Sequence, residues 1–445
     1  MTYFIIDSPN SRLSCIMQGQ ETTASDSVDG LARRTLGNMT EEVHPYTIAV
    51  SDSALSSLQE RLANAAVPED LFDSHDDWRF GVPSSEIRRL VQHWRQGFSW
   101  RRVEAELNEL PHFRTSIDVA NFGDLDIHFV HQRSKDPGAI PLLFCHGWPG
   151  SFLEVRNLLS LLPVANDVKH VSFHIVAPSL PNFGFSQGVS KPGFGLREYA
   201  TVCHKLMLQL GYKQYVTQGG DWGFHITRTM GLLFPESCKA SHLNVSECFP
   251  PSLVQHPILW LQDKLLPRTP HEKTGLERTA EHQRDGMGYD ILQSTRPQAL
   301  AYALSSDPVF LLSWIYEKLV LWTDSYPWTD DEILTWVSLY WFSIAGPAAS
   351  IRIYYEANHA DIAECGVPYD RPKQWIPLVK YGVSSFPRDL TVNPNPWVAT
   401  LGDVVLHTRQ PHGGHFAAVE CPEAIARDLQ TMFAPRGPCY GLLGQ

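Results

Sequence analysis

The sequence lacks an apolar run long enough to cross a bilayer, because its most apolar stretch, Val309 to Trp322, is short and contains Glu317 and Lys318. Its eight cysteines include no CxxC pair and no spacing typical of a metal site or a disulfide framework. Residues 1–30 lack the basic start, apolar core and cleavage site of a signal peptide. Excess positive charge is also absent, since the net charge is -12. These absences predict a cytoplasmic protein with free thiols and without stable membrane insertion, metal or nucleic-acid partners.

The first half of the sequence begins without a periodic pattern. Residues 1–43 are rich in Ser, Thr, Asn and Gly, which predicts a variable, disordered leader. Helices are then expected from Ser51-Asp52-Ser53, from Ser84 and from about Trp100 to before Pro111, each with helical spacing of apolar residues. Residues 44–123 are therefore predicted to form an N-terminal helical domain.

The rest of the chain alternates short β-prone runs with helix-length segments, which predicts an α/β fold with a mostly parallel sheet. The first core part, residues 124–250, contains expected strands at 126–130, 140–145, 171–176 and 214–217 and a helix at 199–210. Residues 251–370 are helical and interrupted by prolines, which predicts a lid inserted into the sheet domain. The second core part, residues 371–445, contains expected strands at 375–383 and 404–408 and a helix at 422–433.

A candidate nucleophile lies in Gly219-Gly-Asp-Trp-Gly223, directly after a β-prone run. Glycines two places on each side of Asp221 match a nucleophile elbow, in which a strand turns sharply into a helix. A carboxylate at this point can attack an electrophilic sp³ carbon and form an ester with it. Taken alone, the segment is equally compatible with a glycine-rich turn that exposes an aspartate.

A second glycine-rich loop, His146-Gly-Trp-Pro-Gly-Ser151, follows the apolar run that ends at Cys145. Such a loop at the carboxyl end of a strand can offer backbone N–H groups to an oxyanion. We therefore expect the N–H groups of Trp148 and of Trp222, the residue after the nucleophile, to form an oxyanion hole. The alternative is a tight turn with a structural tryptophan.

The remaining catalytic candidates are a histidine and an acid near the C-terminus. In His412-Gly-Gly-His415, the glycine pair favours His415 over His412 as a general base in a loop after the last strand. Asp389 follows a predicted strand, whereas Asp403 precedes one and would lie at the wrong end of it. The order Asp221, Asp389, His415 is the nucleophile, acid, histidine order of α/β-hydrolases.

On these motifs the chain resembles the microsomal-type epoxide hydrolases of the α/β-hydrolase superfamily, from about residue 44 to 433. The resemblance rests on the two glycine-rich segments, on Phe386-Pro-Arg-Asp389 and on Gly413-Gly-His-Phe-Ala-Ala418. It implies an α/β-hydrolase fold and two lid tyrosines that donate hydrogen bonds to the epoxide oxygen. Tyr289 and Tyr354 match those positions, and Tyr355 is a rival for the second.

The resemblance implies a two-step reaction without a metal or organic cofactor. Asp221 attacks the epoxide carbon, and water activated by His415 and Asp389 hydrolyses the ester to a vicinal diol. The expected partner is a small epoxide, and a homodimer is left open. Family members from animals carry a membrane-anchoring N-terminal helix, and the polar leader of this chain does not resemble it.

Three alternatives remain open. A haloalkane dehalogenase uses the same acid and histidine but binds halide through Trp or Asn donors, and the two tyrosine segments favour an epoxide. A catalytically silent relative that only binds ligands would not need the intact acid, histidine and oxyanion loop. The identity of the substrate is also open: the enzyme could detoxify foreign epoxides or open an epoxide in secondary metabolism. Tryptophans in the lid suggest an apolar epoxide but are equally compatible with lid packing: Trp314, Trp322, Trp328, Trp336 and Trp341.

Overall fold

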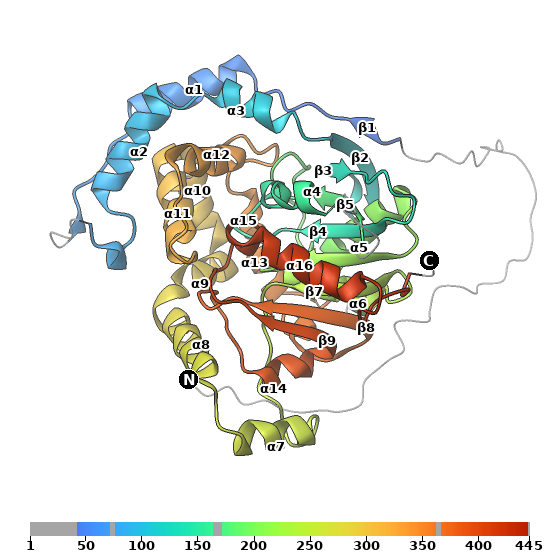
Figure 1. Cartoon of the computed structure of the whole chain (residues 1–445). Coiled ribbons are helices and arrows are strands. Elements are labelled where there is room, and N and C mark those ends of the chain that lie inside the picture. The colour runs from blue at the N-terminus through green and yellow to red at the C-terminus, as the bar shows by residue number, and fades with distance from the viewer. Residues whose placement is uncertain (1–41, 72–75, 163–170, 362–365, 444–445) are drawn as a thin grey trace, which may run out of the picture.

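The computed structural model describes residues 42–71, 76–162, 171–361 and 366–443. The predicted disordered leader, residues 1–43, lies almost entirely outside the described residues. Within them the chain folds around one mixed sheet with helices on both faces and a cap of helices at one edge (Figure 1).

The sheet contains nine strands among the described residues, in the order β1-β2-β3-β5-β4-β6-β7-β8-β9. The pairs from β5 through β4 to β9 are parallel, and those that join β1, β2, β3 and β5 are antiparallel. The α/β class with a mostly parallel sheet is therefore confirmed. The strands are β1 (His44–Pro45), β2 (His112–Val119), β3 (Gly123–Gln132), β4 (Ile140–Cys145), β5 (Phe173–Pro178), β6 (Tyr215–Gly219), β7 (Cys238–Leu243), β8 (Ile376–Ser385) and β9 (Gly402–Arg409).

Helices cover both faces of this sheet because the central strands are apolar on both sides. In β4, Leu143 and Cys145 pack into one core cluster with α5 and α6, whereas Leu142 and Phe144 pack into another with α4 and α16. This is the two-residue alternation of a strand that is buried on both faces. These helices are α4 (Leu158–Leu161), α5 (Leu196–Gln209), α6 (Trp222–Leu233) and α16 (Pro422–Phe433), with α14 (Asn395–Val398) and α15 (Ala417–Glu420) in the C-terminal part.

The sheet begins earlier in the chain than the sequence pattern indicated. The first strand was expected at residues 126–130, but β2 precedes it and pairs with β3 along its whole length, from His112 with Val130 to Val119 with Gly123. Charged residues such as Arg114 and Asp118 alternate along β2, so the segment lacks a continuous apolar run. The strand β7 was missed for the same reason, since it contains Lys239 and His242.

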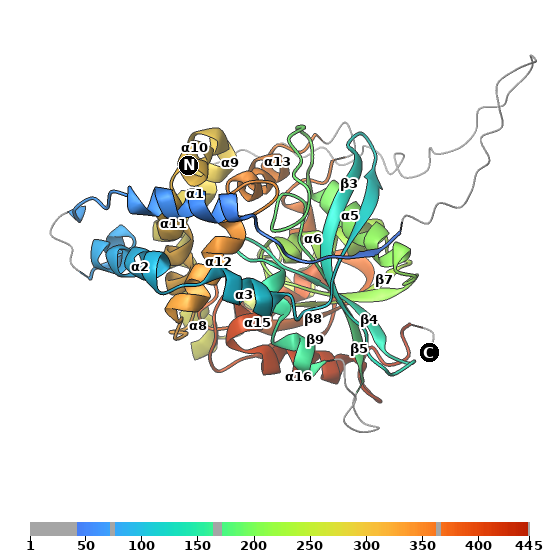
Figure 2. The same cartoon turned by 90° about the horizontal axis from the view of Figure 1, so that it is seen from above.

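Three N-terminal helices, α1 (Asp52–Ala63), α2 (Ser84–Gln96) and α3 (Trp100–Leu107), start where the sequence predicted. The hydroxyl group of Ser51 caps α1 by accepting a hydrogen bond from the Ala54 N–H. Figures 1 and 2 show the three helices lying against the cap of helices. Two arginine ion pairs join them to its helix α12 (Asp330–Trp341), from Arg89 to Asp330 and from Arg102 to Asp331.

The helical cap, or lid, is the chain between β7 and β8. Four of its helices begin with one of the prolines that interrupt the sequence, because proline fits the first turn, where its missing N–H has no acceptor. The helices are α7 (Pro257–Leu265), α8 (Pro270–Glu281), the π-helical turn η5 (His282–Gly286), α9 (Gly288–Thr295), α10 (Pro297–Ser306), α11 (Pro308–Leu321), α12 (Asp330–Trp341) and α13 (Arg352–Asn358). No helix in the described ranges combines the length and apolarity that a bilayer crossing requires.

Candidate active site

Asp221 lies in a strained turn between β6 and α6. Its φ of 50° and ψ of -129° fall outside the regions that L-residues ordinarily adopt. The turn needs its glycines, because a Cβ on Gly223 would lie 1.9 Å from the carbonyl oxygen of Cys145, and one on Gly219 would lie 2.6 Å from that of Gly223. The carboxylate is thereby held at the carboxyl edge of the sheet, as in a nucleophile elbow.

The loop after β4 supplies a hydrogen bond to this carboxylate. The N–H of Trp148 donates to Asp221 Oδ1 at 2.7 Å. This approach requires glycine at position 147, where a Cβ would lie 2.2 Å from the same oxygen. Trp222 is the first residue of α6, and an N–H at that position has no intrahelical acceptor. The Trp148 N–H thus contacts the Asp221 carboxylate directly, and the Trp222 N–H lacks an intrahelical partner, as an oxyanion donor requires.

His415 and Asp389 complete the arrangement from the loops that follow β9 and β8. His415 Nδ1 lies 2.8 Å from Asp389 Oδ1, and its Nε2 lies 3.3 Å from Asp221 Oδ2. Asp389 is buried and also accepts a hydrogen bond of 2.7 Å from the Leu390 N–H. One imidazole thus joins the two carboxylates.

The rivals of these two residues lie elsewhere. Asp403 lies at the opposite end of β9, where it pairs with Lys380 at 3.9 Å. His412 Nδ1 lies 3.3 Å from the sulfur of Cys421, whereas His415 is the histidine that contacts both Asp221 and Asp389.

The charge state of His415 depends on these carboxylates. Burial alone would lower its pKa, but hydrogen bonds to Asp221 and Asp389, together with their negative charges, raise it to about 10. The imidazole is therefore protonated at neutral pH. Loss of the charge on Asp221 would remove one of the two anions that hold this proton.

The two lid tyrosines meet above the tryptophans of the oxyanion loop and the elbow. The ring of Tyr289 stacks on Trp148 with centroids 5.5 Å apart, and Tyr354 packs edge-on against Trp222 at 4.8 Å. The two tyrosine rings are 6.0 Å apart. The Tyr354 hydroxyl is buried and has no hydrogen-bond partner of normal geometry among the described residues. It is therefore available to an acceptor bound between the lid and Asp221.

Both hydroxyls remain protonated at neutral pH. Burial raises the pKa of each well above its usual value, and the negative charge of Asp221 acts in the same direction. The rival Tyr355 is 37% exposed, whereas Tyr354 is 2% exposed. Tyr355 stacks on His359 at the surface, with centroids 4.1 Å apart. Adjacent positions of one helix thus point in different directions.

The lid tryptophans have different surroundings. The ring of Trp322 lies 5.0 Å from the imidazole ring of His415. The backbone carbonyl oxygen of Trp322 accepts a hydrogen bond of 2.8 Å from the backbone N–H of His415. Trp336 donates to the carbonyl oxygen of Pro149, and Tyr340 donates to that of Gly150 at 2.6 Å. The α12 helix therefore holds the oxyanion loop from the lid side.

The other three lid tryptophans lie in packing positions. Trp328 packs against Trp336 at 5.5 Å, Trp314 lies under the Lys318 ammonium group, and Trp341 lies under the Arg61 guanidinium group. Trp322 is thus the member of the predicted tryptophan set that contacts His415.

Sequence reasoning did not identify two further residues beside Asp221. Asn244 follows β7, accepts a hydrogen bond of 2.8 Å from the Gln218 side chain, and occupies the space where a Cβ on Gly220 would lie. Glu154 caps the short helix η4 (Phe152–Val155), and its Oε1 accepts a hydrogen bond of 3.2 Å from the Ser151 N–H. The spacing Ser-x-x-Glu is a capping-box signature, so the sequence did contain a signal for Glu154.

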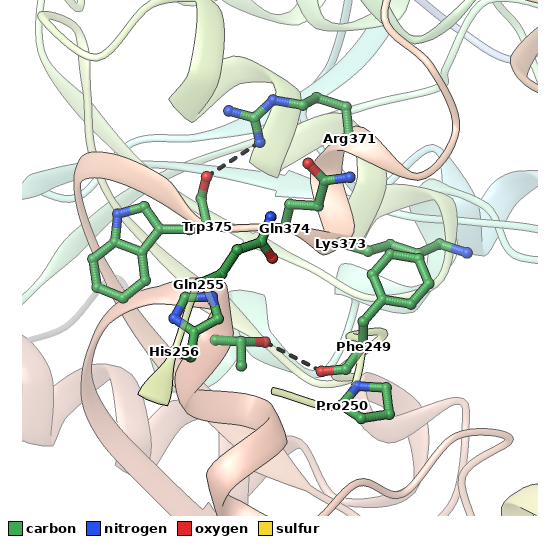
Figure 3. A pocket seen from close by; sticks show the side chains of 9 residues that line it. Phe249, Pro250, Gln255, His256, Arg371, Lys373, Gln374 and Trp375 are labelled. Atoms are coloured by element: carbon green, nitrogen blue, oxygen red, sulfur yellow. Dashed lines mark hydrogen bonds between the residues drawn. The ribbon is translucent and has the colours of Figure 1, made fainter. Parts of the chain in front are cut away.

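A separate pocket of about 630 Å³ lies at the base of the lid (Figure 3). Figure 3 shows the side chains of Arg371, Trp375, His256 and Phe249 around it. An Arg371 N–H donates to the carbonyl oxygen of Trp375 at 3.2 Å. None of the catalytic candidates lines this pocket.

Two family models match the chain. A model of the epoxide hydrolase N terminus matches residues 43–155, and a model of the alpha/beta hydrolase fold matches residues 140–287. Epoxide hydrolase 1 of Oryctolagus cuniculus is 32% identical over 429 residues, which cover 90% of this chain and 90% of that protein. A Stigmatella aurantiaca protein that carries the provisional name epoxide hydrolase is 38% identical over 400 residues, covering 88% and 84% of the two chains.

Solved structures of epoxide hydrolases have the same fold. The structure of Aspergillus niger epoxide hydrolase superposes with a TM-score of 0.76 at 34% identity and covers 88% of this chain and 95% of that one. Juvenile hormone epoxide hydrolase from Bombyx mori superposes with a TM-score of 0.77 at 28% identity, over 87% and 93% of the two chains. The chain therefore belongs to the microsomal-type epoxide hydrolase family of the α/β-hydrolase superfamily.

Proposed function

We propose how the residues of this epoxide hydrolase divide the work of opening an epoxide to a vicinal diol. Asp221 is the nucleophile, Tyr289 and Tyr354 donate to the epoxide oxygen, and His415, oriented by Asp389, is the general base. The observation that carries the proposal is that the Asp221 carboxylate lies 3.3 Å from His415 and close enough to two protonated phenols for its charge to raise their pKa.

The first step forms an ester. Because Trp148 holds Oδ1, the other oxygen, Oδ2, attacks the less hindered epoxide carbon. The carbon–oxygen bond of the epoxide breaks, and the leaving oxygen takes a proton from one of the tyrosines. A phenol suits this task because it stays protonated at neutral pH, here with its pKa raised further by burial, and can stabilise an emerging alkoxide by donating a hydrogen bond.

The second step hydrolyses the ester. Esterification removes the charge of Asp221, so the pKa of His415 falls and His415 gives its proton to the tyrosinate. The neutral imidazole then removes a proton from water, whose oxygen attacks Cγ of Asp221. The leaving alcohol takes the remaining proton of that water, which restores the carboxylate and the protonated histidine.

The oxyanion formed on Oδ1 in this step is received by backbone N–H groups. Trp148 already donates to Oδ1, and the Trp222 N–H is the second donor. Donors that are in place before charge develops need no rearrangement, and the loss of one typically costs about 10²- to 10³-fold in rate.

A single turnover in water enriched in heavy oxygen tests the scheme, with enzyme in excess over styrene oxide. The diol should contain only ordinary oxygen, because its new oxygen comes from Asp221. Heavy oxygen should appear in the Asp221 carboxylate, where peptide mass spectrometry detects it. Heavy oxygen in the first-turnover diol would rule out the ester.

The natural substrate is proposed to be an apolar epoxide, which the aromatic surroundings of Asp221 support: Trp148, Trp222, Tyr289, Trp322 and Tyr354. A panel of styrene-type, alkyl and polyketide-like epoxides, with product stereochemistry, separates a detoxifying enzyme from one dedicated to a biosynthetic step. Halide release from haloalkanes would instead favour the dehalogenase alternative.

A cytoplasmic location and a homodimer also belong to the proposal. The six described cysteines are free thiols, which is typical of a reducing compartment. Cell fractionation tests the location, and light scattering on the purified protein tests the oligomeric state.

A further inference from the structure

A small cavity lies on the sheet side of Asp221. It is lined by Asp221, His415, Glu154 and Asn244 and by residues at the carboxyl ends of β4 and β6, whereas Tyr289 and Tyr354 lie on the lid side. The cavity leaves about 10 Å³ for the centre of a water molecule, close to the smallest space that holds one water. Its polar lining supplies the several hydrogen-bonding partners that a bound water needs.

Glu154 is built into this cavity by the oxyanion loop. Its Oε1 accepts from the Ser151 N–H and lies so close over the loop that a Cβ on Gly150 would be 1.9 Å away. The other oxygen, Oε2, makes no hydrogen bond with any described residue. Burial raises the pKa of this carboxyl to about 8, the positive charge of His415 lowers it, and the negative charge of Asp221 raises it. Esterification removes the Asp221 charge and its contribution, and Oε2 acts as an acceptor in the ionised form of the carboxyl. Glu154 is thus a half-buried carboxyl group that lines the cavity and that the two-step scheme does not use.

We infer that Glu154 is a positioning residue that holds the hydrolytic water between itself, His415 and Cγ of Asp221. The inference rests on the proposed function and assigns its second step to the sheet side of the nucleophile. Oε2 accepts a hydrogen bond from one proton of the water, while His415 removes the other. The lone pair of the water oxygen is thereby directed at the ester carbon.

This arrangement separates the two half-reactions in space. The epoxide approaches Oδ2 from the lid, where the tyrosines lie, whereas the water waits on the opposite side of the carboxylate. A residue that positions only the water should affect ester hydrolysis and leave ester formation unchanged.

The variant Glu154→Gln tests this role without removing the cap. The amide oxygen must accept from the Ser151 N–H, so the amide NH₂ faces the cavity and replaces an acceptor with a donor. In rapid-quench single turnovers with styrene oxide, we expect ester formation within about twofold of wild type. Ester hydrolysis should slow by about 10²-fold, the scale of a misplaced reacting group, and the ester should accumulate.

Glu198→Gln is the matched control. Glu198 Oε2 accepts from the N–H of Gly195, three residues before it, and burial also raises its pKa, but it does not line the cavity. Both steps should keep their wild-type rates in this control. Glu154→Asp, which retains the acid but shortens it, should hydrolyse the ester at a rate between those of wild type and Glu154→Gln.

Two outcomes would overturn the inference. Wild-type ester hydrolysis in Glu154→Gln would show that the water is held elsewhere, and equal slowing of both steps with a lowered Tm would show a structural role. A His415→Gln reference distinguishes these from failure of the whole scheme. If that variant also traps no ester, the covalent route itself is wrong; if it traps one, only the role of Glu154 is affected.

Discussion

The sheet edge and the lid hold their polar groups in different ways. At the sheet edge, backbone N–H groups and ion pairs fix Asp221, Asp389 and His415 at distances of 2.7 to 3.3 Å. In the lid, Tyr289 and Tyr354 are placed by aromatic packing, and the Tyr354 hydroxyl has no partner of normal geometry in the described chain. The charged groups are thus fixed by hydrogen bonds and ion pairs, whereas the Tyr354 hydroxyl lacks a partner, as its proposed role as a donor to the epoxide oxygen requires.

Removal of the base should give the largest effect and should separate the two steps. In His415→Gln, ester formation should proceed while turnover falls by roughly 10⁴- to 10⁶-fold, as for loss of a triad histidine. Intact-protein mass spectrometry should show the mass of one substrate added to the enzyme. His412→Gln is the matched control from the same loop and should retain wild-type turnover. Absence of the adduct in His415→Gln would contradict covalent catalysis.

Loss of the orienting acid should be nearly as severe. Asp389→Asn keeps the shape of the side chain but removes its charge, so the imidazole loses its preferred tautomer and part of its basicity. Turnover should fall by about 10⁴-fold, as for the equivalent change in a serine triad. Asp403→Asn, at the other end of β9, should leave turnover unchanged. Steady-state diol formation measures both variants.

Each lid tyrosine should contribute less to the rate than His415 or Asp389 does, and it should act on ester formation. Tyr289→Phe and Tyr354→Phe should each slow ester formation by about 10²- to 10³-fold, the scale for one lost oxyanion donor. Rapid-quench measurement of the ester should show its hydrolysis unchanged. Tyr355→Phe should have no effect on either step. If these variants slowed ester hydrolysis and left ester formation normal, the assignment of the lid tyrosines to ester formation would be wrong.

The smallest expected effect is on stability. His415 holds its proton up to about pH 10 in the folded protein but only to about 6.5 when unfolded. Its contribution to the free energy of unfolding is therefore complete below pH 6.5 and is lost as the pH rises to 10. Between pH 7 and 9.5 the Tm of wild type should fall more than that of His415→Gln. Parallel curves would show that this proton adds nothing to stability.

The elements that the sequence predicted most closely are those with one clear pattern. The helix at 422–433 and the strand at 140–145 coincide with α16 and β4, because a proline starts the first and an apolar run defines the second. The strands β2 and β7 escaped prediction because their apolar positions alternate with charged or polar ones. Pairing along β3, and between β6 and β8, stabilises them, and such partners are not visible in a local pattern.

The site residues also fall into those that a local sequence pattern identified and those that required the structure. Glycines at fixed spacing pointed to Asp221 and His415, since strained turns at strand ends restrict which residues fit. The choice between Tyr354 and Tyr355 needed the direction of each side chain from α13, which sequence alone leaves open. Glu154 had a capping signature, but its place beside His415 follows from how the loop after β4 folds back toward the sheet.

The ion pairs between the N-terminal helices and α12 reach further than their surface position suggests. Asp330 and Asp331 begin α12, whose Trp336 and Tyr340 donate hydrogen bonds to carbonyl groups of the loop after β4. Arg89 and Arg102 are thereby linked through α12 to the loop whose Trp148 N–H stabilises the oxyanion in the proposed ester hydrolysis. High ionic strength weakens exposed ion pairs. It should therefore weaken the contact between α12 and this loop and slow ester hydrolysis, although neither arginine touches the reacting atoms.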